Sequence, residues 1–141
     1  MWKESVSILI MPLMLCAAVA LAAESRTEAE RLVGSWAGRA NTGVVIKYRF
    51  TDRNVFWNVD DADFKKEFPG GIQAKYRLEP GEKYLHLDMY DFENAQLKHF
   101  TLRGIVQFRD ANRFRMTAPN EPAATRPREF DEHTVEFTRE E

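Results

Sequence analysis

The chain has 141 residues, a formal net charge of −2 and aromatic residues at 12% of its positions. This length suits one domain with one hydrophobic core. The near-neutral charge argues against a nucleic-acid-binding protein, which usually carries a marked excess of lysine and arginine. The ten phenylalanines argue against a disordered chain, because disordered segments are poor in aromatic residues.

The first 23 residues have the pattern of an export signal. Lys3 precedes an almost wholly apolar run at residues 6–23, and Ala20-Leu21-Ala22 offers the small residues of a cleavage site. We therefore expect a signal peptide over residues 1–23 and a mature protein in the periplasm or outside the cell. The alternative is that residues 6–23 remain as a membrane anchor.

The single cysteine, Cys16, lies inside this leader. A mature chain without cysteine has no disulfide, no catalytic thiol and no zinc–thiolate site. Lipid attachment at Cys16 is a further alternative, but Leu15 stands where a lipidation motif places a small residue.

A short helix and then eight strands are predicted after the leader. Residues 24–33 form a helical lead-in: Ser25 and Thr27 each stand three residues before a glutamate, as capping residues do, and Gly34 ends the helix. From Trp36 onward apolar and polar residues alternate, which is the period of a half-buried strand. The expected strands cover residues 35–40, 44–51, 55–59, 72–79, 85–90, 100–108, 113–116 and 133–139.

The strand pattern predicts an all-β fold. Short strands at regular spacing, separated by turn residues, are typical of a sandwich or an up-and-down barrel. One face of each strand is apolar and the other is charged, as in a sheet that is dry on one side. Closure would remove the unpaired edges of an open sheet. We therefore expect an eight-stranded antiparallel up-and-down barrel over residues 34–141.

Gly34, Trp36 and Arg139 form a predicted structural latch between the two ends of the barrel. Arg139 shares the parity of Val135 and Phe137, so alternation points it inward at the end of the last strand. A buried charge needs a partner. The indole of Trp36 would supply a cation–π contact worth about 0.5–2 kcal/mol, and carbonyls of the lead-in could accept hydrogen bonds. The alternative is that Arg139 points into solvent within a charged tail.

These motifs resemble those of a known family. Leu32-Val33-Gly34-Ser35-Trp36 resembles the Gly-x-Trp start of lipocalin-like barrels, and Phe137-Thr138-Arg139 resembles their closing arginine. Gly104-Ile105-Val106 and Arg126-Pro127-Arg128-Glu129-Phe130 stand between them. This order resembles a lipocalin-like (calycin-type) family of exported bacterial proteins that is abundant in planctomycetes, although Val106 replaces the usual aromatic. The family has no established activity, so the resemblance implies a fold rather than a function.

The inward-facing aromatic residues are the leading candidates for a ligand site. An eight-stranded barrel holds either its own side chains or one small ligand. Buried tyrosine hydroxyls need partners and could orient a ligand in an apolar cup. The alternative is a filled structural core. The predicted ligand-binding residues are Tyr48, Trp57, Tyr76, Phe100 and Phe114.

One polar cluster has atoms that could ligate a metal ion. Two histidines and a carboxylate would suit zinc or iron. However, these residues share the polar strand face, which is expected to meet solvent. We therefore predict no metal site at His86, Asp88, Tyr90 and His99.

Two charged loops have similarly simple interpretations. The acidic loop Asp60-Asp61-Ala62-Asp63 lacks the spacing and the terminal glutamate of a calcium loop. The basic loop Arg126-Pro127-Arg128 could contact an acidic partner, but we expect its arginines to pair with nearby Glu129 and Asp131 instead. We expect both loops to be structural.

No catalytic constellation is apparent, and no cofactor is expected. After the leader only Ser25 and Ser35 remain as serine nucleophiles, and neither lies in a G-x-S-x-G motif. We expect an exported monomer that binds a small apolar or amphipathic molecule in the barrel, with no nucleic-acid partner. The alternatives are a cell-envelope protein-interaction module with a filled interior, and a small hydrolase or isomerase at the barrel mouth.

Overall fold

The computed structural model describes residues 28–119 and 125–140. The chain divides into two units, Met1–Leu32 and Val33–Glu141. In the first unit, residues 28–32 are helical and fall within the predicted lead-in. The predicted signal peptide and Cys16 lie outside the described residues. Within the described part of the chain, no helix is both long enough and apolar enough to cross a membrane.

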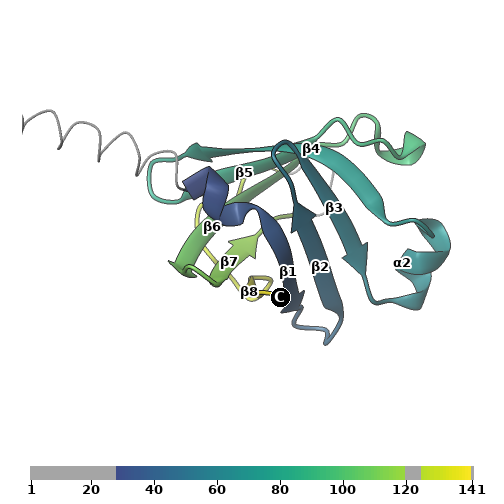
Figure 1. Cartoon of the computed structure of the whole chain (residues 1–141), viewed down its shortest axis with the longest axis horizontal. Coiled ribbons are helices and arrows are strands. Elements are labelled where there is room, and N and C mark those ends of the chain that lie inside the picture. Colours follow the sequence, from purple (N-terminus) through teal and green to yellow (C-terminus); the bar gives the residue numbers. More distant parts are fainter. Residues whose placement is uncertain (1–27, 120–124, 141) are drawn as a thin grey trace, which may run out of the picture. The chain divides into compact units, whose positions relative to one another are not determined.

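The second unit is a closed eight-stranded antiparallel barrel (Figure 1). Each strand pairs with the next along the chain, and β8 pairs with β1. The predicted all-β up-and-down barrel is therefore confirmed. The strands are β1 (Gly34–Arg39), β2 (Val45–Phe50), β3 (Asn54–Val59), β4 (Ile72–Pro80), β5 (Leu85–Tyr90), β6 (Leu102–Asp110), β7 (Arg113–Thr117) and β8 (Val135–Arg139).

β6 and β8 begin two residues later than the alternation predicts, because local turns occupy the first residues of the expected strands. A 3₁₀ helix, η1 (Ala95–Leu97), precedes β6, and the Phe100 amide donates to the Leu97 carbonyl at 3.0 Å. Before β8, the Asp131 carboxylate accepts the His133 amide at 2.9 Å. The backbone amides at these positions thus form hydrogen bonds within turns rather than within the sheet.

The helix α2 (Ala62–Glu67), like η1, was not predicted from the strand pattern, and it includes part of the acidic loop (Figure 1). The Asp61 carboxylate accepts the Phe64 amide at 3.0 Å, which caps the helix at its N-terminus. The Lys65 ammonium donates to Asp60 at 2.9 Å and lowers the pKa of that carboxyl. The acidic residues therefore have local structural roles.

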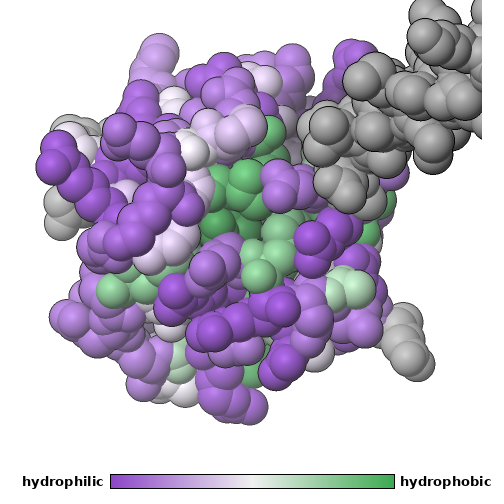
Figure 2. All heavy atoms as spheres, turned by 90° about the vertical axis from the view of Figure 1, so that its left-hand side faces the viewer, coloured by the Kyte–Doolittle hydropathy of each residue, from purple (hydrophilic) through white to green (hydrophobic). Residues whose placement is uncertain are grey.

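Aromatic rings pack against one another inside the barrel. Trp36, Phe114 and Phe137 are each no more than 1% exposed. The ring centroids of Trp36 and Phe114 are 4.6 Å apart, and those of Phe114 and Phe137 are 5.0 Å apart. On the face shown in Figure 2, hydrophilic side chains surround a central hydrophobic area. The barrel thus has a dry, ring-filled inside and a largely polar outside.

Candidate functional site

The structure brings most of the predicted ligand-binding residues into one ring cluster and leaves one apart. Tyr48 lies 5.8 Å from Trp57 and 5.0 Å from Phe137, between ring centroids. Phe137 in turn stacks with Phe114 at 5.0 Å. Phe100 lies outside this cluster, on the connection between β5 and β6. The clustered rings contact each other inside the barrel, which is where the sequence predicted a bound ligand.

The two tyrosines of the predicted site are buried neutral groups. The Tyr76 hydroxyl donates to the Thr51 carbonyl at 2.5 Å, and burial, with a smaller effect of Asp52, raises its pKa. Burial raises the pKa of Tyr48 well above the usual range. Tyr76 is thereby tied to the β2–β3 turn. By contrast, Nε1 of Trp57 is buried without a hydrogen-bond partner among the described residues.

Arg139 makes the contacts that define the predicted latch. Its guanidinium carbon lies 4.2 Å from the ring centroid of Trp36. Its Nη1 donates to the Val33 carbonyl at 2.8 Å, and its Nη2 donates to the Ala111 carbonyl at 3.2 Å. Gly34 has φ +132°, and a Cβ there would lie 2.5 Å from Nη1. Arg139 therefore joins β8 to the start of β1 and to the β6–β7 turn.

The outer face of β5 is not fully solvated, which corrects the expectation for Asp88. This residue is only 6% exposed. Its carboxylate lies 2.7 Å from Arg126 Nη2 and 3.2 Å from Arg77 Nε. Arg126 Nη1 also donates to the Gly104 carbonyl at 2.9 Å. Arg126 thus pairs with Asp88. This corrects the expectation that it would pair with its sequence neighbours Glu129 and Asp131.

The segment that covers this face is the β7–β8 strap, which we define as residues 125–134. The Arg115 guanidinium carbon lies 3.8 Å from the ring centroid of Phe130, and the Tyr84 ring lies 4.7 Å from the same ring. Lys83 donates to Glu129 at 2.7 Å. The strap is therefore held by stacking and ion pairs. In the described part of the chain, no group of three or more His, Cys, Asp or Glu side chains could hold a metal ion.

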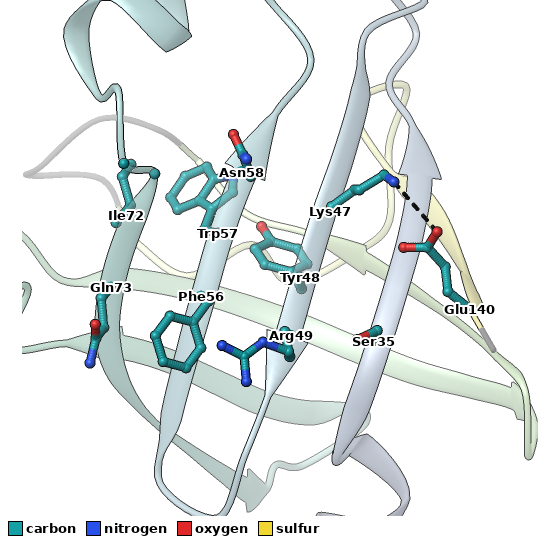
Figure 3. A pocket seen from close by; sticks show the side chains of 12 residues that line it. Ser35, Lys47, Tyr48, Arg49, Phe56, Trp57, Asn58, Ile72, Gln73 and Glu140 are labelled. Carbon is teal, nitrogen blue, oxygen red and sulfur yellow. Dashed lines mark hydrogen bonds and ion pairs between the residues drawn. The ribbon is translucent and has the colours of Figure 1, made fainter.

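A groove of about 450 Å³ lies on the outer face of β1–β4 (Figure 3). The strand register places one row of lining side chains side by side across four strands: Ser35, Arg49, Phe56 and Gln73. A second row, on β2 and β3, contains Lys47 and Asn58. Gly70 and Gly71, just before β4, and Glu140 also line the groove. The lining is completed by Tyr48, Trp57 and Ile72, so two of the predicted ligand-binding residues lie at the groove.

The groove holds one uncompensated positive charge. The Arg49 guanidinium lies 4.1 Å from the ring centroid of Phe56 and forms neither an ion pair nor a hydrogen bond with any described residue. Figure 3 shows the Arg49 side chain reaching from β2 toward the phenylalanine ring on β3. Lys47, in contrast, pairs with Glu140 at 3.5 Å. Arg49 is therefore the group in the groove that is best able to bind an anion.

The groove also carries neutral polar groups. The Asn58 carbonyl oxygen accepts the Val59 amide at 2.9 Å, which leaves its NH₂ group available. The side chains of Ser35 and Gln73 make no hydrogen bond to another described residue. Of the lining residues, Tyr48 and Trp57 were predicted from the sequence to bind a ligand, whereas Ser35, Asn58 and Gln73 were not predicted to form a site. A signal was present, because Phe56 is a large aromatic residue on the polar face of its strand.

Comparison of the chain with protein-family models, curated proteins and solved structures finds no match. The interpretation of function therefore depends on the groove, the ring contacts inside the barrel and the charges around the groove.

Proposed function

We propose that this protein is a non-catalytic binding module that holds an anionic partner on the outer face of β1–β4. This develops the alternative in which an exported barrel has a filled interior and acts through its surface. The observation that carries the proposal is Arg49, stacked on Phe56 in the groove without a carboxylate partner in the described part of the chain.

The state of Arg49 differs from that of several other arginines on the barrel. Arg77, Arg113 and Arg126 each lie within 3.2 Å of a carboxylate oxygen. A guanidinium has five N–H donors and cannot lose its charge at physiological pH. Stacking on an aromatic ring holds it in place, so less side-chain entropy is lost when it binds. Arg49 is thus a pre-positioned donor for a carboxylate or a phosphate.

The packing of the interior supports a role for the surface. The Phe137 ring contacts both the Tyr48 ring and the Phe114 ring. A ligand in the centre of the barrel would have to separate these three rings. Interiors are packed as closely as organic crystals, so such a separation would cost much of the dispersion energy of the core. We also propose, from the predicted leader, that the protein is exported.

A second candidate function is the binding of a small apolar or amphipathic molecule, as the sequence led us to expect. It is favoured by Trp57 Nε1, which is buried without an acceptor among the described residues. An unsatisfied buried donor costs about 1–3 kcal/mol, and a ligand oxygen would remove that cost. Such a ligand would lie near α2, since the Trp57 and Phe64 rings are 6.3 Å apart.

The test is to titrate the labelled protein with acetate, pyrophosphate, trigalacturonate, hexaglutamate and laurate while recording backbone amide shifts by NMR. We expect at least one of the anions to shift amides of Ser35, Arg49, Phe56 and Gln73. Arg49→Gln should weaken that binding by about 10-fold or more, because a hydrogen bond to a charged group is worth about 1.5–3 kcal/mol.

Arg53→Gln is the matched control, because Arg53 is exposed in the β2–β3 turn, outside the groove lining, and the substitution changes the charge equally. It should leave the affinity within about twofold of the wild type. Shifts at Trp57 and Phe64 with laurate, without shifts at Ser35, Arg49 and Gln73 with any of the other anions, would instead support the second candidate. No groove shift with any anion would overturn the first.

A further inference from the structure

We infer that the anionic partner is an acidic polysaccharide, bound through the carboxylate of a hexuronate unit; this inference rests on the proposed function. Three features of the groove distinguish this class from nucleic acid, phosphate and peptide. They are its charge balance, its neutral hydrogen-bonding groups and its few accessible apolar side chains.

The charge balance favours a ligand with well-separated charges. Arg49 is uncompensated, whereas the charge of Lys47 is balanced by Glu140 at 3.5 Å. Nucleic acids and other polyphosphates are bound by several cations together, and the Glu140 carboxylate would repel closely spaced phosphates. A polysaccharide with one carboxylate per sugar can place one charge at Arg49 and keep the next away from Glu140.

The neutral groups favour a ligand that is rich in hydroxyls. Asn58 offers its NH₂ group, Gln73 offers both an amide donor and an acceptor, and Ser35 offers a hydroxyl. Adjacent strands are about 4.8 Å apart, so the row from Ser35 to Gln73 spans about 14 Å. A sugar chain lying across the strands would present hydroxyls on both sides of each carboxylate. The row therefore matches an extended polar ligand.

The accessible apolar side chains of the groove are two aromatic residues, fewer than the set of anchors in a typical peptide site. Peptides and proteins bind mainly through buried aromatic or aliphatic anchors. Tyr48 and Ile72 are each only 5% exposed, so Phe56 and Trp57 supply the accessible apolar side-chain surface, and Arg49 already covers one face of the Phe56 ring. A peptide could also add to a sheet as an extra strand, but the strands of the described barrel are paired on both sides.

The decisive experiment compares trigalacturonate with its methyl ester, which has the same hydroxyls but no charge, by isothermal titration and NMR on the full chain. We expect trigalacturonate to bind in the groove and the ester to bind at least about 10-fold more weakly. Arg49→Gln should reduce trigalacturonate binding to the level of the ester and leave ester binding unchanged. Gln73→Ala should weaken the binding of both ligands.

The controls separate failure of this inference from failure of the proposed function. Arg53→Gln should bind like the wild type, and an unchanged amide spectrum outside the groove shows that each variant is folded. Equal binding of the ester and the acid, or a clear preference for hexaglutamate or pyrophosphate at the groove, would overturn the polysaccharide inference alone. Absence of any anion from the groove would overturn both.

Discussion

The guanidinium carbon of Arg139 lies 4.2 Å from the ring centroid of Trp36, and the two residues are also Cα partners between β1 and β8. These strands are in register only from Trp36 to Gly38, so β1–β8 is a short seam in the barrel. The same guanidinium donates to the Val33 carbonyl at 2.8 Å. One side chain thus supports the seam through stacking and hydrogen bonding together.

We expect loss of either partner to destabilise the barrel. Trp36→Ala should lower the free energy of unfolding by about 3–5 kcal/mol, because it leaves a large cavity in the core. Arg139→Ala should lower it by about 1–3 kcal/mol through loss of the cation–π contact and the hydrogen bonds. Urea unfolding followed by circular dichroism measures both. Arg53→Ala is the control, expected within about 0.5 kcal/mol of the wild type. Unchanged stability in both latch variants would refute the role of this contact.

Gly34 provides a finer test of the same contact. Gly34 and Gly43 both have positive φ, at +132° and +91°. A Cβ at Gly34 would lie 2.5 Å from Arg139 Nη1, whereas a Cβ at Gly43 would have no atom within 4 Å. Alanine should cost about 1–3 kcal/mol at either position through backbone strain. Gly34→Ala should cost more, because it also displaces the guanidinium.

The extra cost at Gly34 should disappear when Arg139 is replaced. In a double-mutant cycle, Gly34→Ala combined with Arg139→Ala should destabilise the protein by less than the sum of the two single effects. Thermal or urea unfolding of the four proteins gives the coupling. Strict additivity would mean that the steric contact at Gly34 has no energetic consequence.

Strand alternation predicted the barrel well, because each strand has one dry and one wet face. It could not predict α2, which is only six residues long. Helices of this length are marginal on their own and depend on tertiary packing. In α2 the Phe64 ring contacts Trp57 at 6.3 Å and Phe68 at 5.2 Å. The helical spacing of Phe64 and Phe68 is visible in the sequence, but their contact with β3 is not.

Alternation assigns a side chain to a face but does not say what covers that face. Asp88 and Ile105 both lie on outer faces, yet they are 6% and 2% exposed. Arg126 of the strap, which contacts this region, lies more than 20 residues away from Ile105 in the sequence.

The groove was missed for a similar reason. The pairing of Arg49 with Phe56 depends on the register between β2 and β3, which alternation alone leaves open.

The Asp88–Arg126 contact should hold the strap closed. Arg126→Ala removes one of the two guanidiniums that contact the buried Asp88 carboxylate and also the hydrogen bond to the Gly104 carbonyl. We expect a loss of about 1–3 kcal/mol in urea unfolding. Digestion by a glutamate-specific protease should also cut the strap faster at Glu129. Arg128→Ala, at a neighbouring position in the strap, should change neither result. Equal digestion rates in the two variants would count against the clamp.

Tyr48 should make the barrel sensitive to alkaline pH. Burial raises its pKa in the folded state, whereas an unfolded tyrosine has a pKa of about 10. The folded protein therefore holds the phenolic proton more tightly than the unfolded chain. The stabilisation is fully present below about pH 10 and is lost as the pH rises further, by up to about 1.4 kcal/mol per pH unit.

Tyr48→Phe keeps the ring and removes this proton, so the fall in stability above about pH 10 should become shallower. Urea midpoints at pH 8, 9.5 and 10.5 measure the slope. Tyr76→Phe is the comparison, since burial also raises its pKa but its hydroxyl donates to the Thr51 carbonyl. That variant should lose about 1 kcal/mol at neutral pH as well, because the carbonyl loses its donor. The same alkaline slope in Tyr48→Phe and the wild type would show that burial does not keep the Tyr48 hydroxyl neutral in the folded barrel.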